Sequence, residues 1–407
     1  PNGNNEGNQP PLYYLLAAPL AAGVDLSGAD RIRLNPQMGW QGDKAGIAAA
    51  AHLLDEGWPY HGVFLAAHRI RLLSVLLGVL TVALTYGVAL ACTSSKGSAF
   101  LAAAFVALLP GFIFGSATIN NDALVNALSA FLLYLTVRAA PIPSRRYALA
   151  FGIVCCLALV TKLHAVTPVL VGLATLVLRA PPGRRAGVGA LAVAPLLPAA
   201  AFWLWRFSSG EHNLIGTFVT WPPPLPGSTG ALDWSLPWRF AIDMWTSFFG
   251  VFGRQNVFMP GALYILYAGV YVGGLVMAAL LIRKLPATPM NRQAGVLFWW
   301  SGLLLAAIIA RYTLLPGDRT GYASSRFLYP ALPAIATLVA YGWSRAVSIA
   351  PRLQGLGAPA LAAGTALAVA LPWSVIRPAY VPPYPIGDSV PVQATAVTSG
   401  SFAQSVQ

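Results

Sequence analysis

The amino-acid sequence predicts an all-helical integral membrane protein. Of its 407 residues, 57% are hydrophobic and only 9% are charged, whereas about 25% of residues are charged in a soluble domain. So few charged residues cannot form a water-exposed surface for a chain of this length. Most of the outer surface must therefore face lipid.

Ten predominantly apolar windows are long enough to be considered membrane-spanning helices. The fourth and fifth are short, and form either a hairpin that does not fully cross or one helix broken around Thr161 to His164. The windows cover residues 72–92, 97–117, 119–137, 147–161, 163–179, 186–207, 261–282, 294–315, 327–349 and 355–377.

Two polar stretches divide the chain and suggest its organisation. Residues 1–64 form a predicted loop with interfacial helices, and residues 208–260 form a second loop rich in Trp and Pro. Membrane helices are expected over 65–207 and 261–377, followed by a polar tail over 378–407. The chain begins with Pro1 rather than Met, so we expect a further segment upstream.

The charged residues predict the orientation of these helices. If every window crosses the membrane, one face receives 12 basic residues and no acidic ones: Lys96, Arg138, Arg145, Arg146, Arg179, Arg184, Arg185, Arg283, Lys284, Arg292, Arg345 and Arg352. The other face receives all 12 acidic residues. The positive-inside rule places the first face in the cytoplasm and both polar stretches outside. The distribution of charge also excludes nucleic acid as a partner, since the basic residues are scattered over five short loops and form no basic face.

Sequence motifs exclude several enzyme classes. The chain has no Gly-rich phosphate loop, H-E-x-x-H zinc motif or G-x-S-x-G nucleophile elbow, which argues against a P-loop ATPase, a zincin and an α/β-hydrolase. The cysteines Cys92, Cys155 and Cys156 have no metal-ligand spacing and are interpreted as packing residues. Because every carboxylate falls on the outer face, acid-base or metal chemistry is expected there, beyond the reach of cytoplasmic nucleotides.

Six segments, in order, resemble bacterial multi-pass proteins related to the protein O-mannosyltransferases and aminoarabinose transferases. They are E-G-N-Q-P-P-L-Y-Y-L-L from Glu6, R-L-L-S-V-L-L-G at 71–78, L-L-P-G-F-I-F-G-S-A-T-I-N-N-D-A-L at 108–124, T-K-L-H-A at 161–165, S-F-F-G-V-F-G-R-Q-N-V at 247–257 and S-R-F-L-Y-P-A-L-P at 325–333. The resemblance implies the type C glycosyltransferase fold.

The same resemblance implies a polyprenyl-phosphate sugar as donor. It also implies that a carboxylate in the first outer loop acts as a base or as a metal-linked group, with a divalent metal ion as an optional cofactor. The principal acidic motif of these proteins follows their first transmembrane helix, and we expect it upstream of Pro1. This chain has Asn8 where the resembling segment often has His.

Candidate acceptor-side residues lie near the start of the chain. Glu6 is the best visible carboxylate for an acceptor hydroxyl or a metal, and its alternative role is that of a solvated terminal residue. Gln9 and Tyr13 are candidates for hydrogen bonds to a sugar. We favour an interfacial aromatic belt for Tyr13 and its neighbour Tyr14, and likewise an interfacial role for Trp221, Trp234, Trp238 and Trp245 in the second loop.

Candidate phosphate-binding residues are Lys162, Arg326 and Arg319. Lys162 lies between two apolar runs, where an ammonium is costly without an anionic partner, and the alternative is that it extends to the interface. A guanidinium holds phosphate bidentately, but an Arg at a lipid headgroup is the alternative for Arg326 and Arg319. His164 is a further candidate for sugar binding, or a packed, hydrogen-bonded residue.

Asp122 is a candidate catalytic residue, although an acid that stabilises a helix N-terminus is the favoured interpretation. Arg71 is either an interface anchor or a partner for Asp122.

Together with the resemblance, these residues predict a glycosyltransferase of the bacterial cytoplasmic membrane. Its active site would face outward, and the enzyme would transfer a sugar from a polyprenyl-phosphate donor to a lipid, glycan or protein acceptor. Two alternatives stay open: a transporter or flippase for lipid-linked sugars, and a non-catalytic protein of envelope assembly. The sequence shows no clear internal repeat of the kind that transporters commonly have.

Overall fold

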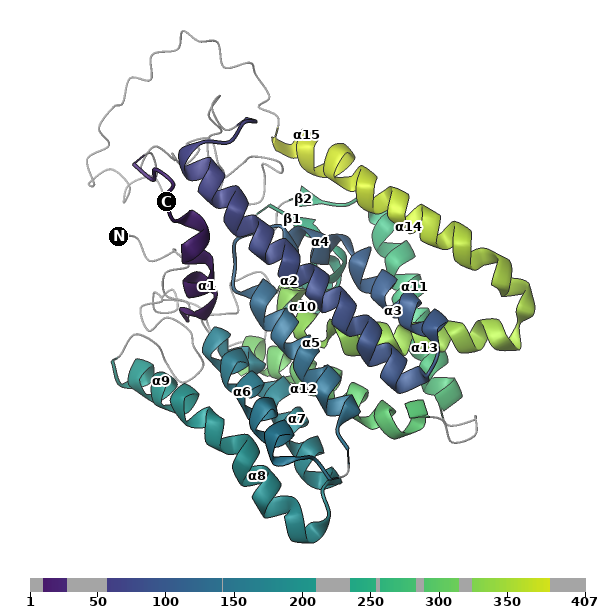
Figure 1. Cartoon of the computed structure of the whole chain (residues 1–407). Coiled ribbons are helices and arrows are strands. Elements are labelled where there is room, and N and C mark those ends of the chain that lie inside the picture. Colours follow the sequence, from purple (N-terminus) through teal and green to yellow (C-terminus); the bar gives the residue numbers. More distant parts are fainter. Residues whose placement is uncertain are drawn as a thin grey trace.

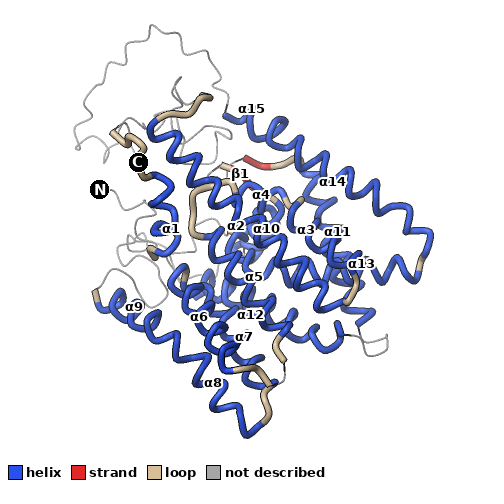
Figure 2. Tube along the Cα trace, in the orientation of Figure 1, coloured by secondary structure: helices blue, strands red, loops and turns tan. Residues whose placement is uncertain are grey.

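The structure is a computed structural model that describes residues 10–27, 57–140, 142–209, 235–253, 257–282, 289–314 and 324–380. In these residues the fold is almost entirely helical, and Figure 2 shows the helices in blue. The predicted all-helical membrane fold is therefore confirmed at this level.

The first half of the chain forms a bundle around α2 and α5 (Figure 1). Its helices are α1 (Leu12–Ala21), α2 (Gly62–Thr93), α3 (Lys96–Ala107), α4 (Pro110–Ser116), α5 (Asp122–Arg138), α6 (Arg145–Thr161), α7 (Val166–Arg179), α8 (Arg185–Val193) and α9 (Leu197–Ser208).

The second half adds helices and one hairpin. Its elements are α10 (Ser235–Phe249), β1 (Val251–Phe252), β2 (Val257–Phe258), α11 (Gly261–Ile282), α12 (Pro289–Leu314), α13 (Leu332–Ile349), α14 (Gly357–Leu371) and α15 (Arg377–Tyr380). A 3₁₀ segment, Ser325–Ala331, leads directly into α13. The strands pair antiparallel, Val251 with Phe258 and Phe252 with Val257.

Each of the ten predicted windows contains a helix, but not every helix can be assigned as a membrane span. In the part of the chain that the structure describes, five helical runs are long and apolar enough to cross a membrane, or six if the bent pair α3 and α4 forms one span. The others, including α5 and α6 with 17 residues each, are shorter. The predicted break is present, because α6 ends at Thr161 and α7 begins at Val166. Ten crossings remain a prediction.

α2 has the burial pattern of a helix surrounded by lipid. Leu72, Leu76, Val79 and Leu80 are exposed, while the opposite face buries Ser74, Gly78, Thr81 and Thr85. The hydroxyls of the two threonines donate to backbone oxygens one turn earlier, at 2.9 and 2.8 Å. Small and hydroxylated residues allow close helix packing where lipid removes the hydrophobic drive for association. Apolar residues on the outer face and small or hydroxylated residues on the inner face explain how so apolar a helix packs against its neighbours.

Helix ends that are predicted to share one face of the membrane can be located in Figure 1. Figure 1 shows the start of α2 and the end of α15, both expected on the outer face, at the upper edge of the molecule. The connections α2–α3 and α13–α14, both expected in the cytoplasm, lie away from that edge. The charge pattern alone predicts which edge lies on which side of the membrane.

Helices α11 and α13 approach so closely that their contact requires glycine. A Cβ atom added at Gly342 would lie 2.0 Å from the backbone oxygen of Gly274 and 2.8 Å from the amide nitrogen of Ala278. These are backbone atoms, which cannot move aside without separating the helices. This contact fixes α13, and therefore the 3₁₀ segment before it, against the bundle.

We predict that Gly342→Ala lowers the thermal unfolding temperature of the detergent-purified protein. Overpacking of this kind costs about 1–3 kcal/mol. Gly295→Ala in α12 is the matched control, because an added Cβ there meets no atom within 4 Å. Unfolding would be followed by intrinsic fluorescence. Equal unfolding temperatures for the two variants would contradict the close contact.

Candidate functional site

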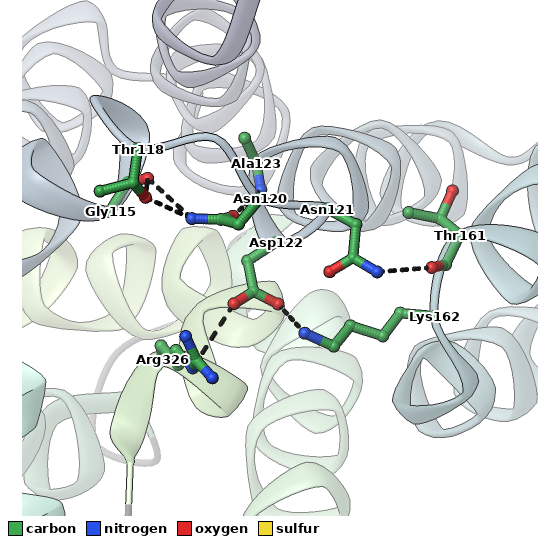
Figure 3. Close-up of polar contacts among 9 residues, drawn as sticks. All are labelled: Gly115, Thr118, Asn120, Asn121, Asp122, Ala123, Thr161, Lys162 and Arg326. Atoms are coloured by element: carbon green, nitrogen blue, oxygen red, sulfur yellow. Dashed lines mark hydrogen bonds and ion pairs between the residues drawn. The ribbon is translucent and has the colours of Figure 1, made fainter. Parts of the chain in front are cut away.

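Asp122 lies at the start of α5 and contacts two cationic side chains from distant parts of the chain (Figure 3). The Lys162 ammonium donates to Oδ1 of Asp122, and Nε of Arg326 lies 3.6 Å from Oδ2. The Asp122 and Lys162 side chains are 9% and 14% exposed, whereas that of Arg326 is 48% exposed. One carboxylate thus holds a largely buried ammonium and a half-exposed guanidinium.

The two asparagines before Asp122 fix its position. The Asn120 amide oxygen accepts the backbone N–H of Ala123 at 3.2 Å, and its nitrogen donates to Thr118 Oγ1 and to the Gly115 oxygen. The Asn121 amide nitrogen donates to the backbone oxygen of Thr161 at 3.2 Å, which ties α5 to the end of α6. The side-chain cap of α5 is therefore supplied by Asn120. Asp122 lies in the first turn, as predicted, but its carboxylate binds cations.

The ring of Phe327 brings three cations together. The Lys162 Nζ atom lies 5.2 Å from the ring centroid, and the Cζ atoms of Arg311 and Arg326 each lie 5.3 Å from it. These distances are within the range of cation–π attraction. Asp122 is the carboxylate in contact with this group among the described residues. The cluster of Asp122, Lys162, Arg311, Arg326 and Phe327, here called the cation cluster, is therefore suited to an anionic ligand.

His164 borders the cation cluster. Its ring lies 5.7 Å from that of Phe327 in an edge-on arrangement. Its Nε2 atom is buried and makes no hydrogen bond to any residue that the structure describes. A buried ring nitrogen without a partner is costly, so a hydrogen bond from a ligand hydroxyl would lower its free energy. His164 is therefore packed beside the cation cluster with one ring nitrogen unsatisfied among the described residues.

The segments that carry the resemblance meet around this site. Tyr13 donates to or accepts from Ser74 at 2.6 Å, and a Cβ at Gly78 would lie 2.7 Å from Ser116 Oγ. Further along, Ser247 Oγ accepts the Ser325 amide at 2.9 Å, and the Tyr329 hydroxyl donates to the Phe248 oxygen at 3.1 Å. With the ion pairs of Asp122, these contacts connect all six segments.

The cation cluster does not suit a divalent metal ion. Both Asp122 oxygens are engaged by cations, and the neighbouring groups would repel a metal. Across the described ranges, no three residues of the His, Cys, Asp and Glu types lie close enough to bind one. We therefore assign no metal-dependent step to these residues.

Several predicted site residues lie outside the described residues: Glu6, Gln9 and Arg319, together with Trp221 and the tail 381–407. For these positions the sequence expectations stay predictions.

Tyr13 corrects one expectation. It is fully buried and its hydroxyl pairs with Ser74, so it joins α1 to α2 and cannot belong to an exposed aromatic belt. This burial also gives no support to sugar binding by Tyr13. Arg71 is exposed, and the carboxylate of Asp122 instead contacts Lys162 and Arg326.

One comparison with known proteins gives a match. Residues 65–205, roughly a third of the chain, match the family described as dolichyl-phosphate-mannose-protein mannosyltransferase. No curated protein and no solved structure matches the chain. The family match and the apolar helices support a membrane glycosyltransferase of type C that uses a polyprenyl-phosphate sugar. The matched region holds Asp122, Lys162 and His164, while Arg311, Arg326 and Phe327 lie beyond it.

Sequence reasoning missed Arg311 and Phe327. Arg311 was detectable, because it is an ionisable residue inside the predicted membrane window 294–315, where such residues indicate function. Phe327 carried no such signal, since an apolar residue in an apolar window is the ordinary case. Its role emerges only when the ends of α12, α6 and the 3₁₀ segment meet.

We predict energetic coupling between Asp122 and Lys162. Asp122→Asn and Lys162→Met should each destabilise the protein, because each leaves a buried charge without its partner. The double variant should lose less than the sum of the two, by about 1 kcal/mol or more. Thermal unfolding of all four proteins in one detergent measures the coupling, and additive losses would show that the ion pair contributes nothing.

Proposed function

We propose that this protein transfers a sugar from a polyprenyl-phosphate donor to an acceptor hydroxyl on the extracytoplasmic face of a bacterial cytoplasmic membrane. The observation that carries the proposal is the convergence of Lys162, Arg311 and Arg326 on Phe327 beside Asp122. An ionisable cluster of this kind at the end of apolar helices is expensive to bury and is typical of functional sites.

The reaction places its greatest electrostatic demand on the phosphate. The acceptor oxygen forms a bond to the anomeric carbon as the bond from that carbon to the phosphate oxygen breaks. The electron pair stays on the phosphate, so a donor with one negative charge becomes a polyprenyl phosphate with two. Cations held in place before the reaction stabilise this developing charge without reorganisation.

Each residue of the cluster has a role in this scheme. Lys162 and Arg326 bind phosphate oxygens, the latter with a planar guanidinium that can engage two at once. Arg311 adds a third cation. Asp122 orients Lys162 and Arg326, since one of its oxygens accepts from Lys162 and the other forms an ion pair with Arg326, and His164 Nε2 binds a hydroxyl of the sugar.

The acceptor proton needs a separate base. Asp122 is poorly suited, because protonating it would break its contacts with two cations. Glu6 is the candidate. The charge pattern puts Glu6 on the same outer face as the start of α5, where an acceptor from outside the membrane could reach both.

We predict that Lys162→Ala, Arg326→Ala and Arg311→Gln each lower sugar transfer by about 100-fold, the scale of losing one group that stabilises developing charge. The full-length protein in membranes would be incubated with labelled polyprenyl-phosphate sugars and candidate acceptors. Arg345→Gln is the matched control. Its guanidinium also lies over an aromatic ring, that of Tyr341 at 5.4 Å, but it belongs to the predicted cytoplasmic face.

The same assay distinguishes the alternatives. Movement of intact labelled donor across the membrane with no transfer would favour a flippase. Unchanged transfer after Lys162→Ala and Arg326→Ala would refute the assigned roles.

We predict that Phe327→Leu lowers the turnover number while Phe327→Tyr largely retains it. Leucine fills space but has no ring to position the cations, whereas tyrosine keeps the ring. Turnover and the Michaelis constant for the donor would be measured separately, with unfolding temperature as a check on folding. A similar turnover loss in both variants would mean that Phe327 acts by packing alone.

A further inference from the structure

Trp58 is the most exposed tryptophan in the part of the chain that the structure describes. It is 84% exposed, and Trp205, Trp238, Trp299 and Trp373 also exceed 60%. Three of these, Trp205, Trp299 and Trp373, lie inside predicted membrane windows, where lipid covers them. Trp58 precedes the first window, which begins at residue 72. Its exposure therefore needs another explanation.

The length of α2 places Trp58 beyond the membrane surface. With 32 residues, α2 is about 48 Å long, whereas the hydrocarbon layer is about 30 Å thick. The excess lies at its N-terminal end, since His68, Arg69 and Arg71 precede the uninterrupted apolar window. Those first ten residues extend about 15 Å, more than the roughly 5–8 Å headgroup layer on each side. Figure 1 shows this end of α2 at the upper edge of the molecule.

Two neighbouring rings hold this segment in place. The rings of Tyr60 and His68 stack with centroids 3.6 Å apart and planes inclined by 16°. His68 Nδ1 lies 2.7 Å from the Phe64 oxygen, so this nitrogen must carry the proton and donate. Trp58 meets Tyr60 edge-on, with centroids 5.6 Å apart. The Trp58 indole therefore packs against Tyr60, whose ring is stacked on His68 of α2.

An exposed aromatic face is complementary to a sugar ring, which presents apolar C–H groups on one face. We infer that Trp58, supported by Tyr60 and His68, stacks on a sugar ring of the acceptor, so that the acceptor is a glycan. The identification of this ligand as the acceptor rests on the proposed function, whereas binding of a sugar at Trp58 does not.

Binding of short soluble hexose oligosaccharides to the full chain in lipid nanodiscs tests the inference without any donor. We expect Trp58→Ala to weaken binding by about tenfold and Trp58→Phe to retain most of it. Trp299→Ala, which removes an exposed tryptophan within a membrane window, should bind like the parent chain. Absence of binding to any oligosaccharide, or equal binding by Trp58→Ala, would overturn the inference.

This result is independent of catalysis. Donor turnover without oligosaccharide binding would leave the proposed function standing and remove the glycan site. Oligosaccharide binding that depends on Trp58, in a chain that turns over no donor, would support the glycan site and contradict the proposed function.

A second measurement separates a sugar platform from a membrane anchor. The fluorescence that Trp58 contributes, obtained by subtracting the Trp58→Ala spectrum, should be insensitive to quencher-labelled lipid headgroups. Strong quenching by these headgroups would place Trp58 in the membrane surface and overturn the inference.

Discussion

The ion pair between Asp122 and Lys162 is the interaction on which the arrangement of the site depends. A carboxylate at the start of α5 and an ammonium at the end of α6 are both largely withdrawn from water, so neither is tolerable alone. Their pairing fixes the junction of α6 and α7 against α5, and the bond from Asn121 to Thr161 reinforces it. Arg326 joins the same carboxylate and brings the segment before α13 to the same place.

The helices around this junction are held by a different kind of contact. Small residues on α2 and the glycines of α11 and α13 allow backbones to approach closely, which suits a surrounding of lipid. Polar contacts at the helix ends and small residues along the helix bodies therefore have different structural roles. The first group aligns the functional side chains, and the second keeps the helices that carry them rigid.

Sequence reasoning anticipated the helices better than the contacts. Helix positions follow from runs of apolar residues, a local property, and each of the ten windows contains a helix. It also singled out Asp122, Lys162, His164 and Arg326 individually. It did not pair Asp122 with Lys162, because 40 residues separate them and an acid at a helix start is commonly a cap. Nor could it show that Tyr13 is buried, since a tyrosine next to prolines and apolar residues fits the membrane surface equally well.

Phe327 explains how several cations can share one small site before any phosphate arrives. A carboxylate for each cation would neutralise the cluster and compete with the ligand. A ring attracts cations through its quadrupole while carrying no net charge, so it positions Lys162, Arg311 and Arg326 without reducing the positive potential that a phosphate meets. The ring of Phe327 thus does what a further carboxylate could not: it helps to hold the cations in place without adding negative charge that would oppose the anion whose charge grows during transfer.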